Sequence, residues 1–139
     1  MISTLLLRTS VILLLVGLIL GIVMGIRQDF VLAPAHAHLN LVGFVVMFAA
    51  GLYYRLVPAA GEGALAKVQA TLLVVGAITF PLGIAAVLTF GPARFEMLAV
   101  GGALVVFAAV ALFAWIVFRT TAVRAAVSVG RPAGLSLPI

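Results

Sequence analysis

Residues 5–26 read LLLRTSVILLLVGLILGIVMGI, an apolar run in which Arg8 is the one charged residue. A helix needs about 20 apolar residues to cross the roughly 30 Å hydrocarbon core of a bilayer. Because lipid offers the backbone no hydrogen bonds, a helix is favoured there over an open sheet. This run therefore predicts a transmembrane helix.

Three further apolar runs follow, at about residues 35–57, 65–90 and 95–118. The breaks between them are short and hold glycine, proline and charged residues, and short connections favour antiparallel neighbours. We therefore expect residues 1–118 to form an all-α, integral membrane four-helix bundle with up-down-up-down topology. Residues 119–139 are expected to be a cytoplasmic tail that begins as a short helix reaching Val129.

The overall composition agrees with a chain that lies in lipid. Hydrophobic residues make up 66% of the sequence and charged residues 8%, whereas a soluble domain carries about 25% charged residues. The net charge of +5 does not indicate nucleic-acid binding, because the basic residues are scattered among the predicted helix ends. The absence of cysteine excludes disulfides, thiolate metal sites and cysteine nucleophiles.

The basic residues predict the orientation of the four helices. With four spans, both termini and the middle loop share one side of the membrane. That side holds Arg8, Arg55, Lys67, Arg119, Arg124 and Arg131, and the other side holds Arg27 and Arg94. Positive residues prefer the cytoplasm, so we expect the N and C termini to be cytoplasmic. His36 and His38 then lie at the outer end of the second helix.

Small residues on the first helix predict a close helix contact. Gly17, Gly21 and Gly25 follow one another at intervals of four residues, which is the small-residue spacing that lets transmembrane helices approach closely. The ridge either packs helices within one protomer or joins two protomers.

The segment PAHAHLN, residues 34–40, holds both histidines of the chain. Polar residues inside an apolar span are costly and often mark a functional site. Neutral imidazole is a ligand of haem iron and of copper. The alternative is that the two histidines simply face lipid headgroups or a water pocket.

Helix geometry separates the two histidines. At about 100° per residue, His36 and His38 point to nearly opposite sides of the helix, so one helix cannot close both around the same metal. Below His36, on or near the same face, lie Asn40, Gly43, Met47 and Gly51. Glycines there would leave a flat slot for a macrocycle, although ordinary helix packing also explains them.

Residues 36–58, from His36 through the pair Tyr53-Tyr54 to Pro58, resemble the second transmembrane helix of the haem–copper oxidase superfamily. The likeness is greatest to cbb3-type oxidases and bacterial nitric oxide reductases, and the segment is also similar to the NnrS family of nitric-oxide-response membrane proteins. The resemblance implies that His36 ligates a low-spin haem b in a bacterial inner membrane. It covers nothing outside this segment.

The catalytic subunits of that superfamily have at least twelve helices and several further histidines, which this chain lacks, so it is not a complete oxidase or reductase. Their core consists of three arcs of four helices, and the chain resembles one such arc. Three copies would supply twelve helices. The resemblance therefore implies a homotrimer in which His36 of one protomer and His38 of the next hold a haem at each interface.

Three functions remain open at this point, and enzymatic activity is left undecided. The first is a b-type haem protein that transfers electrons to or from a redox partner protein, or handles haem or nitric oxide. The second is a non-enzymatic structural or accessory subunit of a respiratory membrane complex. The third is a copper-handling membrane protein that uses His36 and His38 with Met47 as a soft ligand.

Overall fold

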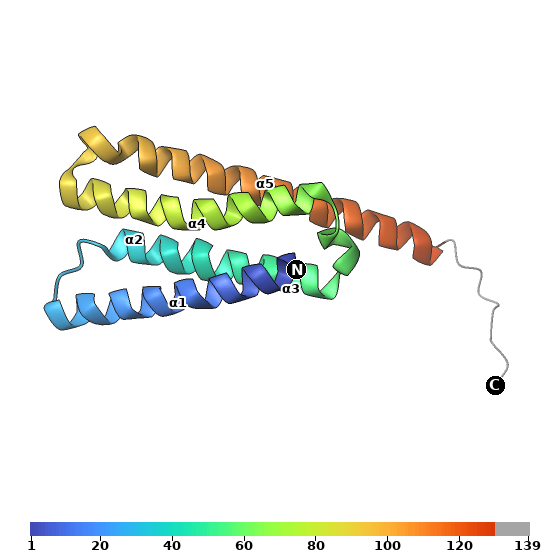
Figure 1. Ribbon diagram of the computed structural model, residues 1–139, viewed down its shortest axis with the longest axis horizontal. Coiled ribbons are helices and arrows are strands. Elements are labelled where there is room, and N and C mark those ends of the chain that lie inside the picture. The colour runs from blue at the N-terminus through green and yellow to red at the C-terminus, as the bar shows by residue number, and fades with distance from the viewer. Residues whose placement is uncertain (130–139) are drawn as a thin grey trace.

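A computed structural model describes the backbone of residues 1–129 and the side chains of residues 1–121 (Figure 1). The described chain is helical: α1 (Ile2–Arg27), α2 (Ala33–His38), a π-helical segment (Leu39–Val46), α3 (Met47–Leu56), a 3₁₀ turn (Pro58–Gly61), α4 (Ala64–Phe90) and α5 (Pro92–Val129). The segments from α2 to α3 follow one another without a break and form a single span.

Within the described residues, four helices are long and apolar enough to cross a membrane. They are α1, the span Ala33–Leu56, α4 and the part of α5 from Pro92 to Thr121. The second span has the lowest mean hydropathy, 1.6 against 2.3 to 2.7 for the others, because it carries the polar segment around the two histidines. The prediction of an all-α protein with four apolar helices is confirmed at this level.

The fourth helix is longer than the predicted range 95–118. It starts at Pro92, since proline suits the first turn of a helix, where its missing N–H costs no hydrogen bond. It also continues through Arg119 to Val129, so the helix expected at the start of the tail is an extension of α5. The rest of the predicted tail, residues 130–139, lies outside the described residues.

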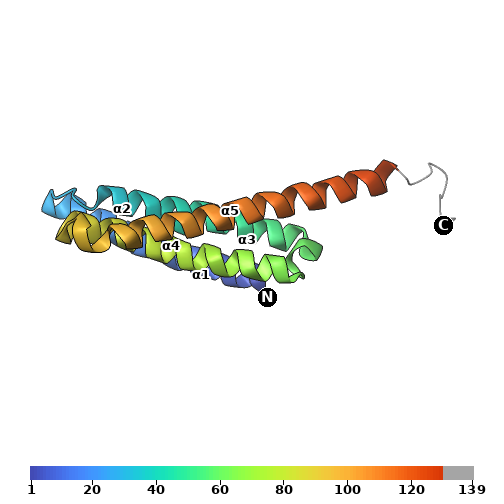
Figure 2. The same cartoon turned by 90° about the horizontal axis from the view of Figure 1, so that it is seen from above.

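Neighbouring spans pack as two pairs that meet through α4. Helix α1 lies along the second span, α4 packs along α5 in the most extensive contact of the molecule, and α2 joins the two pairs by packing on α4. Figures 1 and 2 show successive spans joined at alternating ends, with α1 and α5 farthest apart in the row of Figure 1. The second span is thus placed between α1 and α4.

Small residues allow the close approach of α4 and α5. A Cβ atom on Gly83 would lie 2.5 Å from the backbone nitrogen of Ala99, and one on Gly102 would lie 2.7 Å from Cα of Phe80. At these distances the space at each glycine holds a hydrogen atom but not a methyl group. Small residues of this kind let transmembrane helices pack closely.

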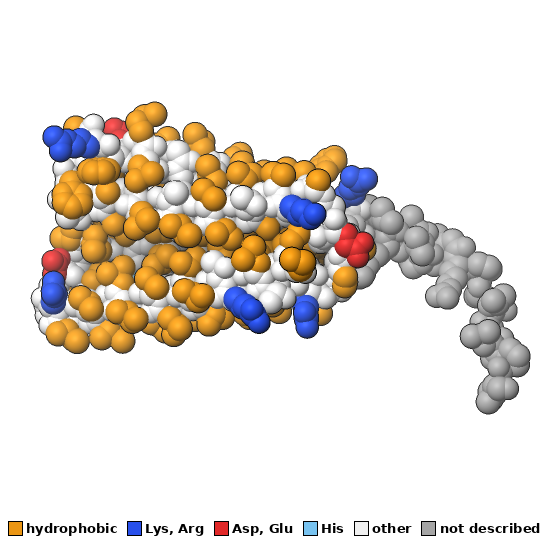
Figure 3. Space-filling view, viewed as in Figure 1, with side chains coloured by type: hydrophobic (Ala, Val, Ile, Leu, Met, Phe, Trp, Pro, Cys, Tyr) orange, Lys and Arg blue, Asp and Glu red, His pale blue; other side chains and the backbone are white. Residues whose placement is uncertain are grey.

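The outer surface is apolar along the spans. Large hydrophobic side chains are exposed on every span, among them Ile19, Leu41, Leu82 and Phe107. Figure 3 shows hydrophobic side chains over the middle of the visible face and charged side chains toward its two ends. A soluble monomer rarely exposes so large an apolar surface, whereas a bilayer covers it.

Candidate functional site

The histidine segment lies in the first turns of the second span. Pro34 stands in the first turn of α2, where its fixed φ favours helix initiation, and the backbone N–H of His36 donates to the carbonyl of Leu32 at 2.9 Å. After His38 the chain continues as the π-helical segment. We did not predict this wider helix, because its residues, LNLVGFVV, have no pattern that separates it from an α-helix. Short π-helical insertions are frequent at functional sites.

The imidazole of His36 is held by α1 and by its own helix. Its Nδ1 lies 3.0 Å from the carbonyl oxygen of Gly17. A carbonyl only accepts, so Nδ1 carries the proton and donates it. The amide nitrogen of Asn40 lies 3.2 Å from Nε2, which in the neutral ring accepts. Both ring nitrogens of His36 are therefore hydrogen-bonded within one protomer, which fixes the tautomer.

The side chains of His36 and Asn40 pack against the glycine ridge of α1. A Cβ atom on Gly21 would lie 3.0 Å from Cε1 of His36, and one on Gly17 would overlap Oδ1 of Asn40. Gly25, the third residue of the ridge, has nothing within 4 Å of such an atom. Two of the three glycines thus pack helices within the protomer. Oδ1 of Asn40 is buried there and has no hydrogen-bond partner among the described residues.

His38 has a different environment. Its Nδ1 lies 2.8 Å from the carbonyl oxygen of Pro34, to which it donates, and its ring packs edge-on against Phe80 of α4 with centroids 4.8 Å apart. The described residues give its Nε2 no hydrogen-bond partner. An Nδ1–H bound to a backbone carbonyl with a free Nε2 is the arrangement that metal-bound histidines adopt. As the helix geometry predicts, the two rings contact different helices.

The other predicted cofactor residues are covered by helix packing. A Cβ atom on Gly43 would lie 3.0 Å from Cδ1 of Leu13, and one on Gly51 would lie 3.0 Å from Cγ of Leu7. The predicted slot along these glycines is therefore occupied by leucines of α1. Met47 is fully buried in the hydrophobic core, away from any surface that a metal ion reaches directly.

The histidines do not belong to a larger ligand set. In the part of the chain with described side chains, no group of three or more histidine, aspartate or glutamate residues could hold a metal ion. One protomer therefore offers a metal at most isolated imidazoles.

A second polar cluster, which we did not predict, joins three helices at the other end of the second span. The hydroxyl of Tyr54 donates to Oε1 of Gln69 at 3.0 Å, and Nε2 of Gln69 donates to the carbonyl of Ala109 at 3.3 Å. Tyr53 forms a hydrogen bond with Thr120 of α5. Gln69 is fully buried inside the apolar run 65–90, so the rule that singled out the histidines would also have found it.

No family model, curated protein or solved structure matches the chain. The resemblance of residues 36–58 to the haem–copper oxidase superfamily therefore stays a prediction.

Proposed function

We propose that the chain is a b-type haem-binding integral membrane protein that transfers electrons or handles haem or nitric oxide. The observation that supports this best is the free Nε2 of His38, whose Nδ1 is anchored 2.8 Å from the Pro34 carbonyl inside an apolar span. An imidazole with a free Nε2 can bind iron through that nitrogen and keep the hydrogen bond from its Nδ1. His38 would hold the haem, and the apolar surroundings would keep water from the iron.

A second imidazole for the haem would come from another protomer. His36 is the one other imidazole, and it faces α1 while His38 faces α4. A closed ring of protomers, which we propose to be a homotrimer, would bring His38 of one chain toward His36 of the next. His36 could then keep its bond to Gly17, while Asn40 would have to release Nε2.

The proposed orientation places both termini in the cytoplasm of a bacterial inner membrane, with the four spans crossing up-down-up-down. The bias of basic residues supports it, since Arg8, Arg55, Lys67 and Arg119 belong to one end and Arg27 and Arg94 to the other. The haem would then lie toward the outer leaflet, at the level of α2.

A non-enzymatic structural subunit is the second candidate, and one observation favours it. His36 uses both ring nitrogens to pin α2 to α1, which is a complete structural role without any metal. In that case the chain would be an accessory part of a larger respiratory membrane complex.

A visible spectrum separates the two functions. The protein should be produced in cells supplied with haem precursor, purified in mild detergent, and measured oxidised and reduced. A sharp α-band on reduction is the result expected for a six-coordinate b-type haem. A protein that is folded and colourless under these conditions would exclude the haem function and favour the structural one. Native mass spectrometry of the coloured protein should give three chains with up to three haems.

A further inference from the structure

Two hollows follow one another along the interface between α1 and α3. Leu7 lies beside Gly51, which sets the two antiparallel helices in register. On one side of this contact is a groove of about 500 Å³ between Leu7, Arg8, Val11, Ile12, Phe48 and Leu52. On the other side, at the helix ends, is a pocket of about 340 Å³ whose lining includes Ser3, Tyr54, Arg55 and Glu62.

The groove is apolar except at Arg8. Val11, Ile12 and Leu52 are exposed large hydrophobic residues, and they belong to two spans that a bilayer would surround. A groove of this chemistry on the lipid-facing surface suits a hydrocarbon chain. Arg8 is the charged residue in the lining of the groove, and it lies one to two helical turns from Ser3, which lines the pocket.

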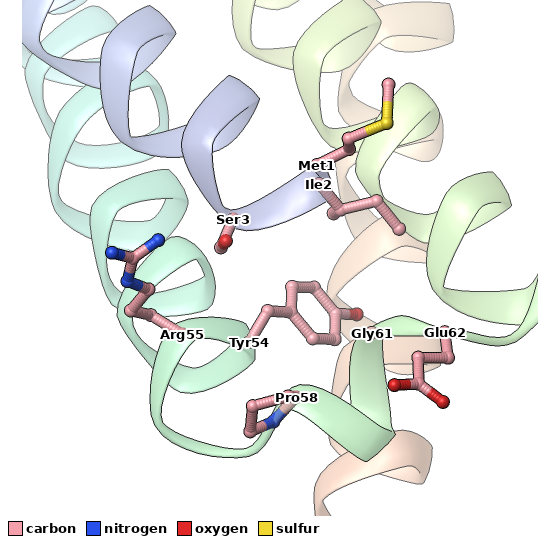
Figure 4. Close-up of a pocket in the computed structure, with 8 residues that line it drawn as sticks. All are labelled: Met1, Ile2, Ser3, Tyr54, Arg55, Pro58, Gly61 and Glu62. Carbon is pink, nitrogen blue, oxygen red and sulfur yellow. The ribbon is translucent and has the colours of Figure 1, made fainter.

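The pocket has more polar groups in its lining than the groove, where Arg8 is the one charged residue. Figure 4 shows Arg55 and Ser3 on one side of the Tyr54 ring and Glu62 on the other. Arg8 and Arg55 are both exposed. Arg8 therefore lines the groove and Arg55 lines the neighbouring pocket, whereas the one carboxylate of the pocket stands across the Tyr54 ring from Arg55. Guanidinium binds phosphate oxygens in a bidentate manner, which an ammonium group cannot do.

We propose that the groove and pocket together bind one anionic phospholipid. Its acyl chain lies in the groove along Val11 and Phe48, and its phosphate lies between Arg8 and Arg55. The charge on this side is positive, so a lipid with net negative charge is preferred to a zwitterionic one. The site uses neither histidine and is independent of haem binding.

Purified full-length protein in mild detergent is mixed with equal amounts of phosphatidylglycerol, phosphatidylethanolamine and phosphatidylcholine. The lipid that stays bound is then measured by native mass spectrometry. We expect one phosphatidylglycerol to be retained in preference. Arg8→Gln and Arg55→Gln should each lower its bound-to-free ratio roughly fivefold, and the double variant roughly thirtyfold. Lys67→Gln with Arg119→Gln is the matched control, since it removes the same charge from the same end outside both hollows.

Two further variants test the apolar groove and the carboxylate of the pocket separately. Val11→Trp fills the groove without changing charge and should lower retention of every phospholipid. Glu62→Gln should leave phosphatidylglycerol binding unchanged or stronger. The proposal is overturned if no lipid is retained, or if the control pair loses as much lipid as the Arg8 and Arg55 pair. Preferred phosphatidylethanolamine that is lost in Glu62→Gln would also overturn it, because Glu62 would then be the ligand of a lipid ammonium.

Discussion

His36 donates a hydrogen bond from Nδ1 to the carbonyl oxygen of Gly17, 3.0 Å away on the neighbouring helix. That carbonyl lies inside α1, and the imidazole packs beside it where Gly21 has no side chain, since a Cβ atom on Gly21 would lie 3.0 Å from Cε1 of His36. Gly21, one turn further, accommodates the edge of the same ring. The imidazole of His36 and the glycines of α1 therefore form a single contact between the two helices.

Alanine substitutions along this ridge should separate its three glycines. Gly17→Ala would overlap Asn40, and Gly21→Ala would press on His36. We expect each to destabilise the protein by about 1–3 kcal/mol, the usual effect of overpacking. Gly25→Ala meets nothing and should be neutral or stabilising by about 0.5–1 kcal/mol, because alanine is the better helix former. Thermal unfolding in detergent measures all three, and equal behaviour of Gly17→Ala and Gly25→Ala would contradict the contact.

The two histidines should respond differently to substitution. His38→Ala should remove bound haem and leave the thermal unfolding midpoint of the haem-free protein nearly unchanged, since the hydrogen bond of the ring stays within its own helix and its aromatic contact is with Phe80. His36→Ala should lower both haem content and that midpoint, because it also removes the bonds to Gly17 and Asn40.

Mixing His36→Ala with His38→Ala protein tests the shared site. In a trimer, some interfaces of the mixture regain one intact histidine of each kind, so part of the haem should return. Haem retained in full by His38→Ala would refute the assignment of iron to this ring.

The hydrogen bond between the buried amide of Gln69 and the hydroxyl of Tyr54 should stabilise the protein. Gln69→Leu keeps the volume but leaves the Tyr54 hydroxyl without an acceptor in the core, which should cost about 1–3 kcal/mol. Tyr54→Phe in the same chain removes the orphaned hydroxyl and should restore much of that stability. A double-mutant cycle on unfolding measures the coupling, and strictly additive effects would show that the hydrogen bond contributes nothing.

Reporter fusions test the proposed orientation. An enzyme that is active only outside the cytoplasm should be silent when fused after Arg119 or in the Glu62–Gly63 turn, and active when inserted beside Gly91. Activity in the first two fusions and silence in the third would reverse the topology.

The sequence predicted the four spans well, because hydropathy over about 20 residues is a strong signal and breaks such as Gly91-Pro92 interrupt it clearly. It placed the end of the fourth helix too early. Helical backbone continues through Arg119 to Val129, and a change from apolar to charged residues does not by itself end a helix.

The candidate site was harder to predict than the spans. Helix geometry correctly predicted that His36 and His38 contact different helices. It could not show that the face below His36 is filled by Leu7 and Leu13, because the same small residues suit either a leucine or a flat ring. Nor could it show which imidazole keeps a free nitrogen, since that depends on Gly17, a residue of another helix.

The π-helical segment Leu39–Val46 bears on how the length of this chain can vary among related sequences. A π-helix has more residues per turn than an α-helix, so the deletion of one residue within it can be absorbed by a change to α-helix. A deletion in α1 between Gly17 and Gly21 would turn one of these glycines away from His36, because α1 is α-helical throughout and has no wider turn to lose. The deletion of one residue should therefore be better tolerated between Phe44 and Val46, past the contacts of Asn40 and Gly43, than between Gly17 and Gly21.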